Sequence, residues 1–406
     1  MSRRLNGIIV LLICALFASC GRINEKTDVE PETFAGVDRE TPEEMWESEP
    51  ETESLTAVDE TSVTKDGEAG IYYYGFENLE TQEERRLYQE VLSSLQRRDV
   101  ETELSTLSVE LIDPIFQCVM ADHPEIFYVD GYTSTTYKLG NSLRKITFSG
   151  DYTLEEEEII ERTGLLEVAA KGFLEGIPKG ADAYETVKYL YEYLIEHTDY
   201  EREVADSQNI CSVLLNGRSV CQGYAKTLQW LCQKAEIPAL LVTGRANGGG
   251  HAWIVVYLDG EWYHVDPTWG DASYLGGEGA YPETAYPAVN YDYFCVTTKQ
   301  IERTHELEAK QNIPTCTAVE DQYYRREGLY LESADSEQLE RIFDEAVRGG
   351  KTTVSFQCAD DNVFDQVYQL LIEEQKVFDY LPEADKKAVY VDSRKQRTFS
   401  FWLNCK

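Results

Sequence analysis

The chain has 406 residues, of which 74 are acidic and 37 are basic, so its formal net charge is −37. Nucleic acid and anionic lipid headgroups are poor partners for such a chain, because both are polyanions. The hydrophobic fraction of 42% is usual for a globular protein, and the length exceeds what one core normally fills, so we expect several structural units.

Residues 1–20 predict a lipoprotein signal peptide. Two arginines precede an apolar run over residues 8–18, which is too short to span a hydrocarbon core of about 30 Å. Two small residues then precede Cys20, as in the lipobox of bacterial lipoproteins, which this segment resembles, although Phe17 stands where Leu is usual. The resemblance implies lipid attachment to Cys20 and an extracytoplasmic, membrane-anchored bacterial protein. The alternative is plain secretion with a coincidental cysteine.

Residues 21–70 predict an acidic, disordered tether. The segment has 16 acids against 4 bases and few large apolar residues. It cannot bury enough surface to offset the entropy of the chain. A lipid anchor followed by such a tether would hold a globular body away from the membrane.

Residues 71–175 predict an N-terminal α/β region. It opens with a Tyr-rich strand or turn at 71–76, and a turn at 123–128 leads into a strand. Apolar residues recur with helical spacing over 81–97, 109–120 and 154–175. A hairpin around Gly140-Asn141 is expected to join strands over 135–139 and 143–148.

Residues 176–317 predict the central domain, which opens with an amphipathic helix over 183–197. Its glycine-rich segment 244–250 precedes a strand rather than a helix. The segment also lacks the Lys-Ser/Thr of a phosphate loop. We therefore interpret it as a mobile loop.

Cys221 lies at the N-terminal end of a helix candidate over 222–235, which Pro238 ends. Free N–H groups and the positive end of the helix dipole stabilise a thiolate at this position. Cys221 is therefore a candidate nucleophile, although a capping or core role is equally compatible with its position. Cys232 lies about 16 Å further along the same face, too far for a disulfide with Cys221, and is expected in the core.

Asp259-Gly260 predicts the turn of a hairpin with strands over 251–258 and 261–266. A two-residue turn fixes the register, so Trp253 opposes Asp266. His251 then lies diagonal to Asp266 on the same face, within reach of a hydrogen bond. A carboxylate there can orient an imidazole and stabilise its charged form.

His264 lies on the same face as Asp266, so geometry alone does not exclude it as the base instead of His251. We interpret His264 as structural. His123, His197 and His305 have no comparable neighbours in the sequence and receive the same interpretation.

Residues 318–406 predict a C-terminal α/β domain. Its strands are expected near 328–332, 352–358, 388–392 and 397–403, and its helices near 335–348 and 362–376.

Ten cysteines are present. Cys14 leaves with the signal peptide and Cys20 is the predicted lipid site. The other eight could form four disulfides in an oxidising compartment, or fewer if one is catalytic: Cys118, Cys211, Cys221, Cys232, Cys295, Cys316, Cys358 and Cys405. No C-x-x-C pair occurs, so neither a zinc ribbon nor a thioredoxin motif is indicated.

Three segments, VCQGYA, HAW and WYHVDPTWGD, resemble the core motifs of the transglutaminase-like superfamily of thiol enzymes. They occur in the order Cys, His, Asp, at intervals of 30 and 15 residues. The resemblance implies that Cys221 is the nucleophile, His251 the general base and Asp266 the orienting acid, which favours His251 over His264. It also implies an α+β, papain-like core, in which a helix bearing the cysteine packs on an antiparallel sheet bearing His and Asp. Small α/β units would flank that core.

The resemblance further implies attack of a thiolate on an amide and a thioester intermediate. The leading hypothesis is a membrane-anchored extracellular peptidase or amidase that acts on proteins or peptides, including cell-wall peptide. An amine acceptor would instead make it a protein-crosslinking acyl transferase. The backbone N–H of Cys221 and an upstream donor, for which Asn216 is a candidate, would form the oxyanion hole. No acidic segment has calcium-loop spacing, so no metal and no cofactor are expected.

A different hypothesis is a catalytically idle module on the same fold that binds peptide or cell wall. It would use the tyrosines that follow the motifs, Tyr281, Tyr286, Tyr291 and Tyr293. Such a module has no chemical need for Cys221, His251 and Asp266 together.

Overall fold

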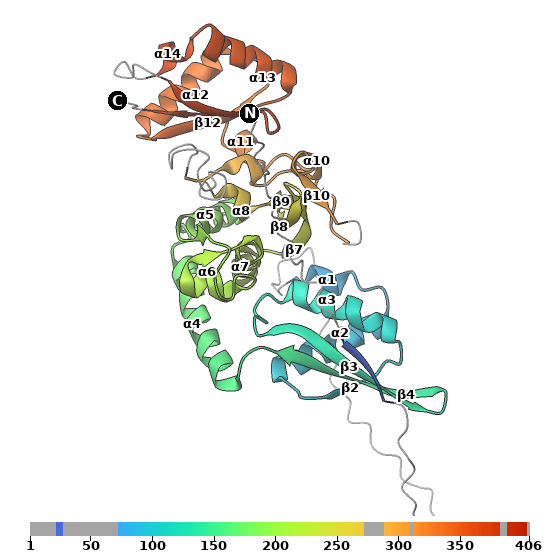
Figure 1. Ribbon diagram of the computed structural model, residues 1–406. Coiled ribbons are helices and arrows are strands. Elements are labelled where there is room, and N and C mark those ends of the chain that lie inside the picture. The colour runs from blue at the N-terminus through green and yellow to red at the C-terminus, as the bar shows by residue number, and fades with distance from the viewer. Residues whose placement is uncertain (1–21, 27–71, 272–287, 309–311, 382–387, 404–406) are drawn as a thin grey trace, which may run out of the picture.

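The structure is a computed structural model that describes residues 22–26, 72–271, 288–308, 312–381 and 388–403. Within these ranges, three four-stranded sheets follow one another along the chain, and the central sheet lies between the other two (Figure 1). No helix in the described ranges is long and apolar enough to cross a membrane. The predicted lipid site Cys20 and the tyrosines Tyr281 and Tyr286 lie outside the described residues.

The N-terminal unit is a sheet of order β1-β3-β4-β2 with helices packed on it (Figure 1). Its elements are β1 (Arg22–Lys26), α1 (Tyr74–Glu77), α2 (Gln82–Arg97), β2 (Thr102–Leu104), η1 (Val109–Leu111), α3 (Ile112–Asp122), β3 (Val129–Leu139) and β4 (Ser142–Tyr152). The predicted helices and the hairpin around Gly140-Asn141 are confirmed. A capping box between Thr81 and Glu84 starts α2, as its sequence permits.

Two expectations in this region need correction. Residues 72–76, expected as a strand or a turn, form no strand, because the buried carboxylate of Asp122 accepts the N–H groups of Gly75 and Phe76 and so supports the short helix α1. The tether prediction fails for Arg22–Lys26, which form β1 and pair in parallel with β3. An open strand edge offers unpaired backbone groups, and an incoming strand satisfies them whatever its composition.

The central domain packs helix α7 against the antiparallel sheet β10-β7-β8-β9. Its helices are α4 (Glu156–Glu175), α5 (Ala183–Glu196), α6 (Ile210–Asn216), α7 (Cys221–Lys234), α8 (Pro267–Gly270), η2 (Tyr291–Tyr293) and α10 (Thr298–Ile301). The helix α4, expected in the N-terminal region, instead packs on α5, α6 and α7 of this domain. Its strands are β5 (Asp199–Tyr200), β6 (Arg218–Ser219), β7 (Ala239–Ala246), β8 (Gly249–Leu258), β9 (Glu261–Val265) and β10 (His305–Leu307). This helix-on-sheet arrangement is the predicted α+β, papain-like core.

The glycine-rich segment 244–250 is not the loop that we expected. Most of it belongs to β7 and β8, and Ala246 pairs with Gly249. Only Asn247 and Gly248 form the turn, with φ of 50° and 77°. Both values lie in the left-handed region that a two-residue hairpin turn requires. The glycines therefore serve a tight hairpin that leads into β8.

The C-terminal unit has a sheet of order β11-β12-β14-β13 and its own core of Phe343, Phe356, Phe399 and Phe401 with their neighbours. Its elements are α11 (Tyr323–Arg326), β11 (Tyr330–Leu331), α12 (Ser336–Arg348), β12 (Thr353–Cys358), α13 (Asp361–Tyr368), η3 (Gln369–Glu373), α14 (Val377–Tyr380), β13 (Val389–Ser393) and β14 (Thr398–Trp402). The predicted strands are confirmed. The single helix expected over 362–376 is instead α13 followed by a π-helical turn, η3. The N-terminal and central units, by contrast, share one continuous core.

Candidate active site

Cys221 is the first residue of α7, and its side chain is partly exposed. The chain reaches it through the short strand β6, where the Ser219 hydroxyl donates to the Ser207 carbonyl oxygen at 3.0 Å. A Cβ atom on Gly223 would lie 1.9 Å from that hydroxyl oxygen. The glycine of the VCQGYA motif therefore lets the first turn of α7 sit directly on β6. This packing presents the thiol at the free N–H end of the helix.

His251 and Asp266 meet at the end of the β8–β9 hairpin. The predicted register is confirmed, since Ile254 pairs with Val265 and Val255 with His264. The ladder ends one residue before Asp266, which caps α8 instead of opposing Trp253. His251 Nε2 lies 2.7 Å from Asp266 Oδ2.

The other carboxylate oxygen of Asp266 binds the backbone. Oδ1 accepts from the N–H groups of Thr268 and Trp269 at 2.9 and 3.2 Å. Pro267 occupies the first helical position, where a backbone N–H would have no partner within the helix, so proline loses no hydrogen bond there. The helix cap thus fixes the carboxylate in the orientation in which His251 meets it.

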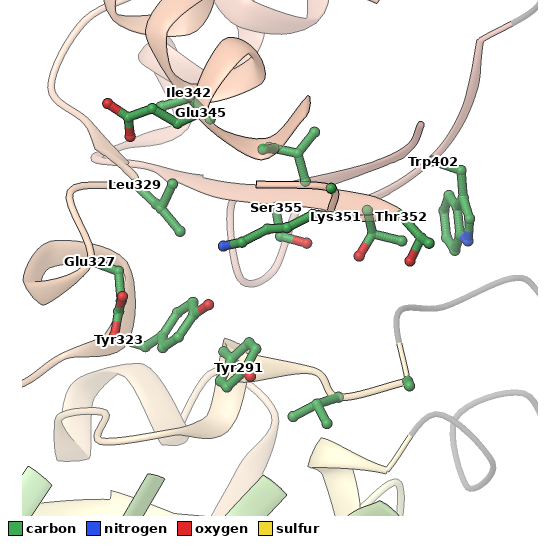
Figure 2. Close-up of a pocket in the computed structure, with 16 residues that line it drawn as sticks. Tyr291, Tyr323, Glu327, Leu329, Ile342, Glu345, Lys351, Thr352, Ser355 and Trp402 are labelled. Carbon is green, nitrogen blue, oxygen red and sulfur yellow. The ribbon is translucent and has the colours of Figure 1, made fainter. Parts of the chain in front are cut away.

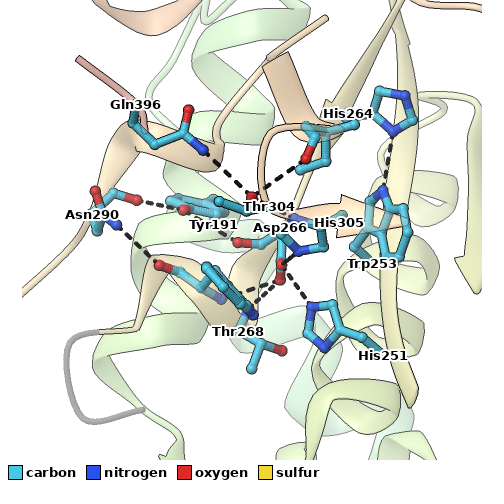
Figure 3. A network of polar contacts seen from close by, with 12 residues as sticks. Tyr191, His251, Trp253, His264, Asp266, Thr268, Asn290, Thr304, His305 and Gln396 are labelled. Atoms are coloured by element: carbon cyan, nitrogen blue, oxygen red, sulfur yellow. Dashed lines mark hydrogen bonds and ion pairs between the residues drawn. The ribbon is translucent and has the colours of Figure 1, made fainter. Parts of the chain in front are cut away.

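A second imidazole binds the same carboxylate. His305, at the start of β10, has its Nε2 atom 3.0 Å from Asp266 Oδ2 (Figure 3). Our structural interpretation of His305, based on its lack of neighbours, is therefore incomplete. Its position depends on the pairing of β10 with β7, in which His305 lies opposite Ala246. The sequence carried no signal for this pairing beyond the histidine itself.

His251 and Asp266 stabilise each other in their charged forms. Burial acts to lower the pKa of His251, but the charge of Asp266, the hydrogen bond between the two side chains and the contact with Cys221 outweigh it and raise the pKa to about 10. Burial acts to raise the pKa of Asp266, yet the neighbouring imidazoles hold it well below its usual range. These opposite shifts favour the imidazolium–carboxylate form of the pair at neutral pH.

Residues 171–267, which contain Cys221, His251 and Asp266, match the sequence profile of the transglutaminase-like superfamily. This chain has a transglutaminase-like domain.

Two curated relatives match part of this chain. The kyphoscoliosis peptidases of Mus musculus and Homo sapiens are 29% and 28% identical to it in an alignment of 103 residues that covers 21% of this chain. The match covers only 16% of the length of either peptidase.

Solved structures align over larger shares of the chain. A TGase crystal structure has 16% identity and a TM-score of 0.26, covering 39% of this chain and 56% of the other. The periplasmic domain of TgpA from Pseudomonas aeruginosa, bound to ethylmercury, has 22% identity and a TM-score of 0.22, covering 31% and 55%.

His264 belongs to a separate network of the transglutaminase-like domain. Its Nδ1 atom accepts from Trp253 Nε1 at 3.0 Å, and its Nε2 atom lies 3.0 Å from the Thr298 hydroxyl oxygen. Burial and the neighbouring His305 lower the pKa of His264 to about 3. A neutral ring with both nitrogens engaged is a structural element rather than a base.

His251, Asp266 and His305 also form a group that could hold a metal ion, since one ligand atom from each lies within 4.8 Å of the others. Such an ion would have to replace the hydrogen bonds of 2.7 and 3.0 Å that the rings now make with the carboxylate. The three side chains are mutually satisfied as hydrogen-bonding partners. Asn216, the suggested oxyanion donor, is an exposed residue at the end of α6.

The cysteines of the described ranges are free thiols rather than disulfides. Five of these seven are buried, and they are distributed over three different cores, with Cys316 and Cys358 in the smaller two. Burial raises the pKa of Cys211 to about 11 and that of Cys316 to about 12. These buried thiols behave as small apolar residues, and no disulfide joins any two of the seven described cysteines.

A cavity of about 810 Å³ lies between the central and C-terminal units (Figure 2). The stacked rings of Tyr291 and Tyr323, 3.7 Å apart, line one wall. Lys351 and Trp402 line the opposite wall. Cys221, His251 and Asp266 do not line this cavity, so it is distinct from the candidate active site.

Proposed function

We propose that this protein is a thiol enzyme with Cys221, His251 and Asp266 as its catalytic residues, and that it cleaves peptide or amide bonds. The observation that carries the proposal is the buried His251–Asp266 pair at 2.7 Å, joined to a partly exposed thiol at a helix N-terminus. The nucleophile neighbours the base, and the base is hydrogen-bonded to the orienting acid, as this type of catalysis requires.

Cys221 and His251 account for each bond that forms or breaks in the proposed reaction. In the reactive form His251 holds the proton of the Cys221 thiol, and the thiolate attacks the substrate carbonyl carbon to form a C–S bond. The imidazolium then protonates the leaving nitrogen as the C–N bond breaks, which leaves a thioester. Water attacks the thioester, gives one proton to His251 and releases the acid, and Cys221 is regenerated. The Cys221 backbone N–H is available to the oxyanion.

Thiol reactivity tests this proposal. The full chain is alkylated with iodoacetamide between about pH 4 and 9, and the labelled cysteine is located by mass spectrometry. We expect Cys221 to react below pH 7, where an ordinary thiol of pKa about 8.5 is protonated. His251→Ala and Asp266→Ala should abolish this reactivity. Cys118 is a matched internal control, because it is also partly exposed but burial raises its pKa.

Two results would overturn the proposal. One is reactivity of Cys221 that is indifferent to His251. The other is equal labelling of Cys221 and Cys118 across the pH range. Either would favour the idle binding module.

Hydrolysis rather than acyl transfer is the second part of the proposal. The name of the curated relatives, peptidase, supports it, although the match covers little of their length. Incubation of the protein with a peptide library and a biotinylated primary amine separates the two reactions. Hydrolysis yields new peptide ends whatever the amine concentration, whereas transfer yields biotinylated products that increase with it.

We also propose that Cys20 carries a lipid that anchors the protein outside a bacterial membrane, where its substrates would include proteins and cell-wall peptide. The support is the signal-like segment 1–20. Metabolic labelling with an alkyne fatty acid should tag the wild type and not Cys20→Ser. Equal labelling of both would contradict the anchor.

A further inference from the structure

The carboxylate of Asp266 is fully occupied as an acceptor. Oδ1 takes two backbone N–H groups, and Oδ2 takes one N–H from each of His251 and His305 (Figure 3). Asp266 and His305 have side chains with no exposed surface. Because a carboxylate has about four lone-pair sites, these four donors leave no position for a proton.

The second imidazole is itself held in place. Because Asp266 can only accept, His305 must carry its proton on Nε2. Nδ1 lies 2.8 Å from the Thr304 hydroxyl oxygen, and that hydroxyl in turn donates to the Ile301 carbonyl oxygen at 3.3 Å. Aromatic rings pack around His305, with the centroids of Trp269 and Trp253 at 4.8 and 5.1 Å. These contacts leave the ring one orientation.

Thr304 receives a hydrogen bond from the C-terminal unit. Gln396, in the turn between β13 and β14, donates from Nε2 to the Thr304 hydroxyl oxygen at 3.5 Å (Figure 3). The Gln396 side chain is buried, and its backbone oxygen accepts from Gln357 Nε2 at 3.0 Å. The turn is thus fixed to its own sheet while its side chain reaches into the transglutaminase-like domain.

A second contact holds the same hairpin against the domain. The Thr398 hydroxyl donates to Asp292 Oδ2 at 2.9 Å, and both residues are buried. Arg303 also donates to the backbone oxygen of Lys395, at 3.3 Å. Gln396 therefore does not meet Thr304 through a loose surface loop.

We propose that His305 is a positioning residue of the candidate active site, and that Gln396 of the C-terminal unit holds it there through Thr304. This inference rests on the proposed function. His305 acts through Asp266: it keeps the carboxylate ionised and aimed at His251, so that His251 carries its proton on Nε2 and turns Nδ1 to Cys221. The matched range of the family ends at Pro267, and both His305 and Gln396 lie beyond it.

The first test reads the imidazoles directly. The chain has five histidines, so single substitutions can assign each signal in ¹⁵N-histidine NMR spectra of the full chain. We expect strongly downfield Nε2–H protons for His251 and His305. The His251 signal should shift in His305→Ala and return toward its wild-type position in His305→Gln, because Gln places an N–H where Nε2 was. Gln396→Ala should move the His305 signal, whereas Lys395→Ala, one residue away and exposed, should not.

The second test reads reactivity. In His305→Ala we expect alkylation of Cys221 at pH 6 to slow about tenfold, which is the loss of one hydrogen bond to a charged group. The acid limb of the pH profile should move to higher pH, a change that mere loss of stability would not cause. His305→Gln should restore most of the rate, and Glu306→Gln, exposed on the same strand, is the control.

The outcomes separate this inference from the proposed function. Wild-type reactivity that does not depend on His251 overturns the proposed function and with it the role of His305. Reactivity that depends on His251 but has the same pH profile in His305→Ala overturns the inference alone. Gln396→Ala spectra that match those of Lys395→Ala overturn the link to the C-terminal unit.

Discussion

At the scale of single residues, the Asp266 carboxylate determines the tautomer and orientation of the imidazoles of His251 and His305. Asp266→Asn keeps an oxygen for the backbone N–H groups of Thr268 and Trp269, but it turns an NH₂ group toward two imidazole N–H donors. His251 must then change tautomer or rotate. We expect alkylation of Cys221 at pH 6 to fall at least about a hundredfold with little change in the circular dichroism spectrum. A variant that retains half of the wild-type rate would contradict the role of Asp266.

The raised pKa of His251 makes a prediction about stability. A group whose folded pKa is raised stabilises the fold fully below its unfolded pKa, about 6.5, and this contribution disappears as the pH rises through the folded value of about 10. The lowered pKa of Asp266 acts in the opposite direction, and its contribution is present above about 3.9. Both contributions therefore coincide between about pH 4 and 6.5.

Urea unfolding of wild type and His251→Ala at pH 5.5, 7.5 and 9.5 checks this window. The difference in unfolding free energy should be largest at pH 5.5 and smallest at pH 9.5. A difference that grows with pH would mean that His251 is neutral in the folded protein.

At the scale of elements, the close contact between α7 and β6 sets the position of the thiol. In Gly223→Ala the new methyl group would meet the hydroxyl oxygens of Ser219 and Ser212 at 1.9 and 2.9 Å and the Ser207 carbonyl oxygen at 3.0 Å. We expect a loss of about 1–3 kcal/mol in the free energy of unfolding and slower alkylation of Cys221, because the start of α7 must move.

A matched glycine serves as the control. Gly164 lies in α4, and a Cβ atom added to it would meet no other atom within 4 Å, so Gly164→Ala should leave reactivity unchanged and stabilise the protein slightly. Removal of the clashing hydroxyl in Ser219→Ala/Gly223→Ala should recover part of the loss. Equal behaviour of Gly223→Ala and Gly164→Ala would contradict the packing argument.

The difference between local and long-range contacts of these elements explains which of them could be predicted from the sequence. The β8–β9 hairpin followed from its turn, because Asp259-Gly260 fixes the register and brings His251 to Asp266. These are local rules, and the structure follows them. No local sequence pattern places His305 at the site, because the short strand β10 reaches it by pairing with β7, about sixty residues earlier in the chain. The helix α1 likewise depends on a distant carboxylate, that of Asp122.

At the scale of the whole molecule, the C-terminal unit has a hydrophobic core of its own but also packs against the transglutaminase-like domain. Its elements were predictable because its helices and strands bury their own apolar faces in a separate core. Its docking was not predictable, because buried polar side chains mediate it and polar residues carry no periodic signal. Tyr324 and Thr398 each donate to one carboxylate oxygen of Asp292, at 2.7 and 2.9 Å.

Asp292 makes this junction sensitive to pH. Burial raises its pKa to about 6, although the hydrogen bonds from Tyr324 and Thr398 act to lower it. The folded protein therefore binds a proton more tightly at this site than the unfolded chain, whose Asp pKa is about 3.9. Stability must fall as the pH rises from about 4 to 6, because the buried carboxylate becomes charged. Above about pH 6 the protein carries the whole of this cost.

Asp292→Asn removes that titration while it keeps an oxygen for Tyr324 and a polar group for Thr398. We expect the unfolding temperature of the variant, relative to the wild type, to rise between pH 4 and 7. Asp392→Asn, on the exposed side of β13, should show no such trend. If the Asp292→Asn difference is constant across this range, Asp292 is ionised throughout, and the two units are joined by a charged junction rather than a neutral one.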